Sequence, residues 1–212
     1  MNSAENSLKE LSEIRRLMEK STRFLSLSGL SGIIAGIAAI LGALVAYFVL
    51  HYNARYFQPD VYFSTYYNLP VSRYIYLLVV DGLAVLLIAL GSGFYFSYRK
   101  AKRTGEKFFD TTALRLLINL GIPLATGGFF CIILLYYKVF FLIGPSTLLF
   151  YGLALINGSK YTLGEIRYLG LSEIILGLVS MMFPGYTILF WSIGFGVLHI
   201  IYGSIMFYRY ER

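Results

Sequence analysis

Four ionisable residues lie within or at the edge of strongly apolar stretches of the chain, namely Asp81, Glu173, His199 and Arg115. Carrying a charged side chain into a membrane is costly, so ionisable residues in such stretches are candidates for function. A histidine titrates near neutral pH, and beside a carboxylate it can form a pair that responds to protons. We therefore treat these four residues as a candidate polar site inside a membrane.

Glu173 and His199 lie on consecutive apolar segments at comparable depth, so the sequence allows them to pair, with Arg115 joining from the inner edge. One interpretation is a proton-responsive pair. The other is a polar contact that fixes helix register, and it is favoured because such contacts are ordinary in membrane bundles. Asp81 has no evident cationic partner at its depth, so we expect it either to be protonated or to face water. It is the first candidate if the protein moves protons or a cation.

Six apolar segments of about 20 residues could position these side chains. The chain has 212 residues and is 58% hydrophobic and 14% charged, whereas soluble domains are roughly 45–50% apolar. A helix needs about 20 residues to cross a hydrocarbon core of roughly 30 Å. We therefore predict an all-α bundle of six transmembrane helices within residues 24–212. The expected crossings are about 25–50, 74–98, 116–137, 142–161, 163–183 and 187–208.

The basic residues predict the orientation of this bundle. With the N-terminus inside, 15 of the 18 Lys and Arg residues fall on the cytoplasmic side, as the positive-inside rule requires. We expect a multi-pass protein of the bacterial cytoplasmic (inner) membrane with both termini in the cytoplasm. The net charge of +7 is then explained by the lipid bilayer as partner, and no nucleic-acid partner is expected.

A polar segment, residues 1–23, precedes the first crossing. Ser7 and Glu10 have the spacing of a capping box, and apolar residues follow at helical spacing. We predict an amphipathic helix in this segment. It either lies on the inner membrane surface or, through residues 7–20, docks a cytosolic protein or a second copy of the chain.

A glycine pattern recurs at the start of alternate apolar segments. Gly–[Leu/Ile]–[Ser/Pro]–x4–Gly runs from Gly29 to Gly36, from Gly121 to Gly128 and from Gly170 to Gly177. Small residues let membrane helices approach closely, so we predict that these six glycines and Gly32 pack helices together. Because repeated patterns indicate repeated structure, we expect three tandem helical hairpins, at 25–98, 116–161 and 163–208.

The third copy also resembles a known family. Gly170–Gly177, reading GLSEIILG, and Phe183-Pro184-Gly185 are similar to the short repeat of the HdeD-like acid-resistance membrane proteins. Around Arg23–Gly32 the chain also resembles uncharacterised six-helix membrane proteins of Bacteroidetes-type bacteria. The resemblance implies a small inner-membrane protein built from tandem hairpins and associated with acid or other stress. It implies no catalytic residues.

Motifs of the common enzymes are absent from the sequence. There is no phosphate-binding loop, H-E-x-x-H, G-x-S-x-G elbow in its strand–turn–helix context, or Cys/His cluster, and Cys131 is the single cysteine. We therefore expect a non-enzymatic membrane protein, either a scaffold or a stress-associated protein, without catalytic residues, metal or cofactor and with homo-oligomerisation left open. The alternative is a small transporter or channel for protons, cations or a small solute.

Overall fold

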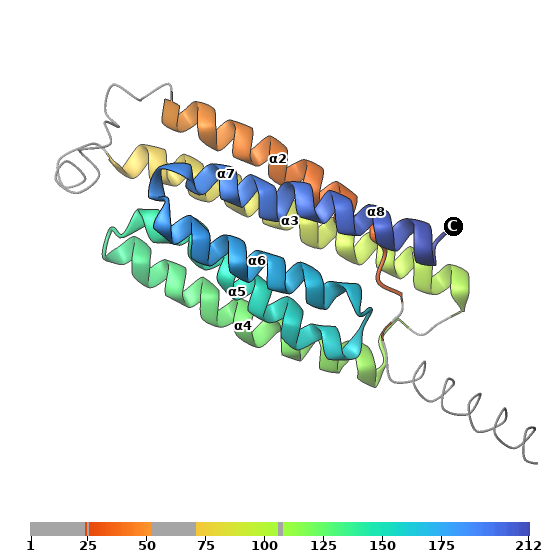
Figure 1. The fold of residues 1–212 in the computed structure, drawn as a ribbon. Coiled ribbons are helices and arrows are strands. Elements are labelled where there is room, and N and C mark those ends of the chain that lie inside the picture. Colours follow the sequence, from red (N-terminus) through yellow and green to blue (C-terminus); the bar gives the residue numbers. More distant parts are fainter. Residues whose placement is uncertain (1–23, 25, 52–70, 106–107) are drawn as a thin grey trace, which may run out of the picture.

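The computed structural model of this chain describes residues 24, 26–51, 71–105 and 108–212. Over these residues the protein is an all-α bundle, as predicted (Figure 1). A π-helical segment, Ser192–Leu198, joins the last two helices into one continuous rod. The helices are α2 (Gly29–His51), α3 (Val71–Thr104), α4 (Thr111–Tyr136), α5 (Ile143–Gly158), α6 (Glu165–Met182), α7 (Thr187–Trp191) and α8 (His199–Tyr210).

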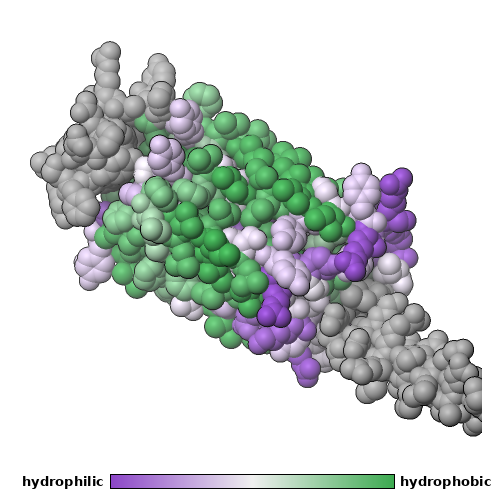
Figure 2. All heavy atoms as spheres, viewed as in Figure 1, coloured by the Kyte–Doolittle hydropathy of each residue, from purple (hydrophilic) through white to green (hydrophobic). Residues whose placement is uncertain are grey.

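Among the described residues, five helical stretches are long and apolar enough to span a membrane, which is the build of an integral membrane protein. They are Gly29–Leu50, Ile75–Thr104, Thr111–Tyr136, Phe140–Tyr161 and Pro184–Tyr210. The remaining long helix, α6, is not among these five stretches. It has 18 residues and carries three charged side chains. The outer surface is a broad apolar band with hydrophilic residues gathered at one end (Figure 2), and residues such as Leu87 and Phe129 are about 70% exposed (69% and 70%). Such a surface suits lipid.

The helices form two groups of three. In one group α2 packs between α3 and the α7–α8 rod, and in the other α5 packs between α4 and α6 (Figure 1). The groups meet where α6 contacts the α7–α8 rod. The candidate residues of α6 and α8 are therefore brought to the junction between the two groups.

Glycines hold the closest helix pairs together. A Cβ placed on Gly36 of α2 would lie 2.6 Å from the carbonyl oxygen of Gly196, and one on Gly170 of α6 would lie 2.8 Å from that of Gly152 in α5. These distances leave no room for a methyl group. Gly29 is also crowded by a facing backbone, and a Cβ on Gly32 or Gly177 would lie 3.1 or 3.0 Å from the nearest facing backbone atom, so all five glycines face a neighbouring helix closely.

The two glycine interfaces use the same spacing. Gly29 and Gly36 face the carbonyl oxygens of Gly203 and Gly196, whereas Gly170 and Gly177 face those of Gly152 and Pro145. Both pairs of facing residues are seven positions apart. In this correspondence Gly203 of α8 takes the place of Gly152 in α5.

The prediction was wrong for the middle copy of the pattern. A Cβ on Gly121 or Gly128 of α4 would meet nothing within 4 Å among the described residues. The neighbouring Gly127 makes the contact instead, against the Phe150 ring of α5. A shift of one residue on a helix turns the contact face by about 100°, so a motif match alone does not fix which face packs.

The helix boundaries also correct the expected crossings. The second crossing was expected to end near residue 98, but α3 continues to Thr104, because its basic end is made of good helix formers. The next helix starts where the Asp110 carboxylate accepts the backbone N–H of Ala113 at 2.6 Å, as N-cap residues do. The predicted N-terminal amphipathic helix lies outside the described residues.

Pro123 lies inside α4 without interrupting it. Proline cannot bond the carbonyl four residues earlier, so the carbonyl of Asn119 loses its helical partner. The side chain of Asn157 in α5 donates to that oxygen at 2.9 Å. A neighbouring helix thus satisfies the polar group that proline freed, as membrane interiors require.

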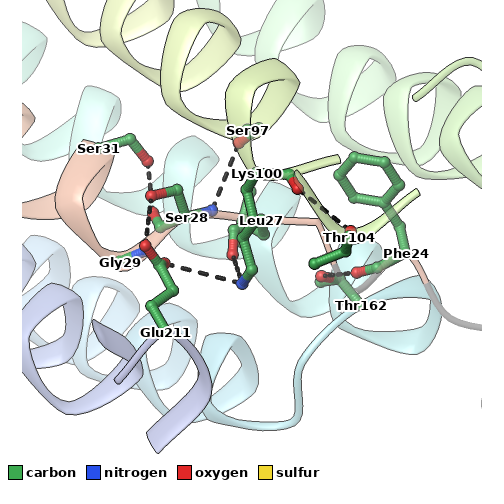
Figure 3. Close-up of polar contacts among 10 residues, drawn as sticks. All are labelled: Phe24, Leu27, Ser28, Gly29, Ser31, Ser97, Lys100, Thr104, Thr162 and Glu211. Carbon is green, nitrogen blue, oxygen red and sulfur yellow. Dashed lines mark hydrogen bonds and ion pairs between the residues drawn. The ribbon is translucent and has the colours of Figure 1, made fainter. Parts of the chain in front are cut away.

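The C-terminal Glu211 ties three distant segments together at the basic end of the bundle (Figure 3). Its Oε1 accepts the backbone N–H of Gly29 at 2.5 Å, and its Oε2 accepts the Ser28 hydroxyl at 3.1 Å. The ammonium of Lys100 lies 3.7 Å from Oε1 and donates to the carbonyl of Leu27 at 2.8 Å. The carboxylate therefore satisfies the first amide of α2 while it pairs with α3.

A methyl group added at a glycine interface should separate the helices. We expect Gly170→Ala to lower the free energy of unfolding by about 1–3 kcal/mol, because a packed backbone cannot yield easily. The matched variant Gly128→Ala should leave stability unchanged or raise it by up to about 1 kcal/mol, since alanine favours helix. Thermal unfolding of both variants in the same detergent, followed by circular dichroism, tests this. Equal losses would contradict the interface.

Removing the side-chain carboxylate of Glu211 should loosen the start of α2. We expect Glu211→Ala to cost about 1.5–3 kcal/mol of stability, the usual contribution of a hydrogen bond to a charged group. Its neighbour Arg212 is exposed, so Arg212→Ala is the control and should cost less than about 0.5 kcal/mol. Amide hydrogen exchange at the start of α2 would localise the effect. Exchange that stays as slow as in the unaltered protein would refute the proposed tie.

Candidate functional site

One face of α6 is continuously buried, and Glu173 lies in its middle. The buried residues follow one another at intervals of one to four positions, as one face of a helix requires. They are Ile166, Leu169, Gly170, Glu173, Gly177 and Ser180. This face is pressed against α5 and against the α7–α8 rod, so the carboxyl group of Glu173 points into the junction of the two helix groups.

The Glu173 side chain is completely buried and incompletely bonded. Its exposed fraction is 0%, and neither carboxyl oxygen has a hydrogen-bond partner among the described residues. Its Oε1 lies 3.5 Å from Nδ1 of His199, within reach of an ion pair but without hydrogen-bond geometry. An unpaired carboxylate in such surroundings is costly. The site is therefore poised to take up a proton or to draw His199 closer.

His199 is held by two hydrogen bonds. Its Nδ1 lies 3.0 Å from the carbonyl oxygen of Gly194, and its Nε2 lies 2.7 Å from the hydroxyl of Tyr151. A carbonyl only accepts, so the neutral imidazole carries its proton on Nδ1. Its Nε2 then accepts a hydrogen bond from the tyrosine hydroxyl. Glu173, His199 and Tyr151 form what we call the buried triad, with one residue each from α6, α8 and α5.

The π-helical segment presents this triad. His199 directly follows Ser192–Leu198, in which the backbone bonds span five residues rather than four. Such segments are frequent at functional sites. A Cβ on Gly194 would overlap Oε2 of Glu173, so glycine is the residue type that fits there. The π segment thus supplies both the carbonyl that orients His199 and the space that admits Glu173.

Aromatic rings connect the triad to the only tryptophan of the chain. Phe195 lies 5.0 Å from the Tyr151 ring and 4.9 Å from Trp191, measured between ring centroids. It also stacks on His199 at 6.0 Å. The single indole is therefore one ring away from two members of the triad.

The structure does not gather the other two predicted residues at this site. Asp81 of α3 is half-buried against α2, where a Cβ on Gly42 would lie 3.4 Å from its Oδ2. Arg115 of α4 is exposed, and within the described part of the chain no ion pair reaches it. The pairing allowed for Glu173 and His199 is observed, and the addition of Arg115 is not.

Two partners escaped prediction from the sequence. Tyr151 is one of 19 tyrosines and Gly194 one of 21 glycines, and neither stands in a recognisable motif. The buried face of α5 could have been traced from Pro145, Leu148 and Gly152, but the fold was needed to aim Tyr151 at His199.

Comparisons of this chain with protein-family models, with curated proteins and with solved structures give no match. The resemblance to the HdeD-like family therefore stays a prediction. Within the described residues no three His, Cys, Asp or Glu side chains are grouped to hold a metal ion. The buried triad is therefore the feature of this molecule from which a function can be inferred.

Removing the tyrosine hydroxyl should unsettle His199 without changing the ring packing. We expect Tyr151→Phe to cost about 1–3 kcal/mol, because a buried ring nitrogen loses its partner. Tyr168 lies on α6 and is 64% exposed, so Tyr168→Phe should be nearly neutral. Chemical or thermal unfolding in a neutral detergent compares the two. If both variants unfold alike, the 2.7 Å contact does not stabilise the site.

Proposed function

We propose that this protein is a non-enzymatic integral protein of a bacterial inner membrane whose bundle responds to proton uptake at the buried triad. Such a response suits a scaffold or stress-associated protein exposed to acid. The observation that carries this proposal is Glu173, which is fully buried, lacks a hydrogen-bond donor among the described residues and lies 3.5 Å from an imidazole nitrogen.

Proton uptake would rearrange the hydrogen bonds of His199. An imidazolium donates from both ring nitrogens, so Nε2 would donate to the Tyr151 oxygen and the tyrosine proton would turn to another acceptor. Nδ1 lies between the Gly194 carbonyl at 3.0 Å and Glu173 at 3.5 Å, and its positive charge would draw it toward the carboxylate. The Gly194 carbonyl would then be released, and with it a bond that orients the π segment.

The three-hairpin repeat and the cytoplasmic termini belong to the same proposal. The shared spacing of the glycine contacts in α2–α8 and α6–α5 supports a common origin for the first and third hairpins. Hydrophilic residues gather at one end of the bundle (Figure 2), and the last turn of α3 is basic. Both features support an orientation with the basic end of α3 inside. A partner bound through residues 7–20 would then reach the bundle from the cytoplasm.

Trp191 offers a direct test of the proton response. The full chain is reconstituted in lipid nanodiscs, and its tryptophan fluorescence is followed between about pH 5 and pH 8, where histidine titrates. We expect one sigmoidal change in intensity or emission maximum, because Phe195 joins the indole to the triad. Glu173→Gln should shift or abolish this change, since it removes the carboxylate that would attract the imidazolium of His199. His199→Gln should abolish the change, since it removes the imidazole itself.

The second histidine provides the matched control. His51, at the end of α2, is the only other histidine of the chain, and His51→Gln should leave the transition intact. A flat titration of the unaltered protein, or one that persists in both triad variants, would refute the proposal.

A flux measurement separates a proton response from transport. Proteoliposomes are assayed for proton or cation uptake with the unaltered chain, Asp81→Asn and Glu173→Gln. The proposal expects uptake no faster than in protein-free liposomes. Uptake that depends on either carboxylate would instead establish the transporter alternative.

A further inference from the structure

The basic end of the bundle contains a small cavity with an uneven charge. Its volume is about 230 Å³, and it lies between the last turns of α3, the start of α2 and the C-terminus. Its polar lining includes Arg99, Lys100 and Arg103 from α3, together with Ser28 and Glu211. Three cationic groups thus face one carboxylate. The cavity is smaller than the roughly 300–1,000 Å³ of pockets for drug-sized ligands, so a small polar group fits it best.

The one carboxylate is already committed to the protein. Glu211 accepts the amide of Gly29 and the hydroxyl of Ser28, and Lys100 lies 3.7 Å away. Its side chain is only 7% exposed. Its charge is therefore balanced by Lys100 and by the positive end of α2 (Figure 3).

The two arginines remain without a carboxylate. Arg99 and Arg103 are exposed, lie four residues apart and so share one face of α3. Within the described residues neither side chain forms an ion pair or hydrogen bond. A guanidinium presents a fork of donors that matches two oxygens of a phosphate. Two such groups, one helical turn apart at the mouth of a cavity, form a receptor for a phosphate-bearing anion.

The position of the cavity favours a lipid phosphate. α3 has 34 residues and is thus about 51 Å long, well beyond the roughly 30 Å of a hydrocarbon core. Its basic last turns therefore extend to headgroup depth. The remaining lining residues, Leu30 and Phe96, are apolar and half-buried, and Phe96 lies one turn nearer the membrane-spanning part of α3 than Lys100. The cavity thus has a cationic mouth and an apolar wall.

We propose that this cavity binds the phosphodiester headgroup of an anionic phospholipid, held by Arg99 and Arg103, with the start of an acyl chain against Leu30 and Phe96. Basic pockets between membrane helices bind anionic headgroups in this manner. Because Glu211 occupies the inner side of the cavity, a lipid with a neutral or glycerol headgroup extension fits better than one with a second negative charge near that carboxylate. The proposal is independent of the proton response of the buried triad.

Native mass spectrometry of the full chain in a neutral detergent tests this site. The probes are phosphatidylglycerol, phosphatidylcholine and inorganic phosphate. We expect phosphatidylglycerol to bind more tightly than phosphatidylcholine. Arg99→Gln combined with Arg103→Gln should weaken phosphatidylglycerol binding about 25-fold, since each basic residue near an anionic lipid contributes about fivefold in affinity. Arg103→Gln alone should weaken it about fivefold.

The matched control removes two charges elsewhere. Lys102 and Arg167 are exposed and do not line the cavity, so Lys102→Gln combined with Arg167→Gln should leave the affinity nearly unchanged. Equal binding of the two lipids, or equal losses in both double variants, would overturn the proposal. Displacement of the lipid by inorganic phosphate at equal concentration would also overturn it, because the site would then recognise a free anion.

Discussion

Close contact between helix backbones is the constraint on which the rest of this bundle depends. Lipid is as apolar as a leucine side chain, so burial of apolar surface does little to bring membrane helices together, and dense packing has to do it instead. The glycines of α2 and α6 lie against carbonyl oxygens of the facing helices, which brings α8 onto α2 and α5 onto α6. Only with both pairs closed can α6 meet α8, and only there can Glu173 approach His199. The polar site is therefore a consequence of the glycine contacts.

Inside this packed junction the polar groups are few, and those around His199 have specific neighbours. Gly194 leaves space for a carboxyl oxygen, Tyr151 satisfies one nitrogen of His199, and the carbonyl of Gly194 satisfies the other. The Glu173 oxygens, like the hydroxyls of Ser146 and Ser180, are buried without hydrogen bonds among the described residues, and of these three side chains that of Glu173 can carry a charge. A membrane bundle gains nothing in stability from such a group. That imbalance is the reason to attribute a function to Glu173 rather than a purely structural role.

The helices of the bundle could be predicted from the sequence, but only some of the contacts between them could. Apolar length predicted six helical stretches, and the glycine spacing predicted the faces of α2 and α6, because both signals are local. The same spacing failed at Gly121 and Gly128, since local pattern cannot say whether a neighbouring helix is present on that face. The bond from Asn157 to Asn119 and the tie of Glu211 to Gly29 join residues 38 and 182 positions apart. Such contacts depend on tertiary packing, which no periodicity in the sequence encodes.

The same packing determines where a change at His199 can spread. Toward the C-terminus, α8 is fixed by Gly203 against Gly29 and Gly32, and beyond its end Glu211 is bonded to the start of α2. Sliding α8 would force backbone atoms into one another at the glycine contacts and would break the hydrogen bonds of Glu211. Toward the N-terminus the π segment contacts α2 where Gly196 faces Gly36, and Trp191 ends α7, a helix of only five residues. A proton taken up at the triad should therefore be felt at Phe195 and Trp191, while the contacts of Gly203 and the basic end stay in place.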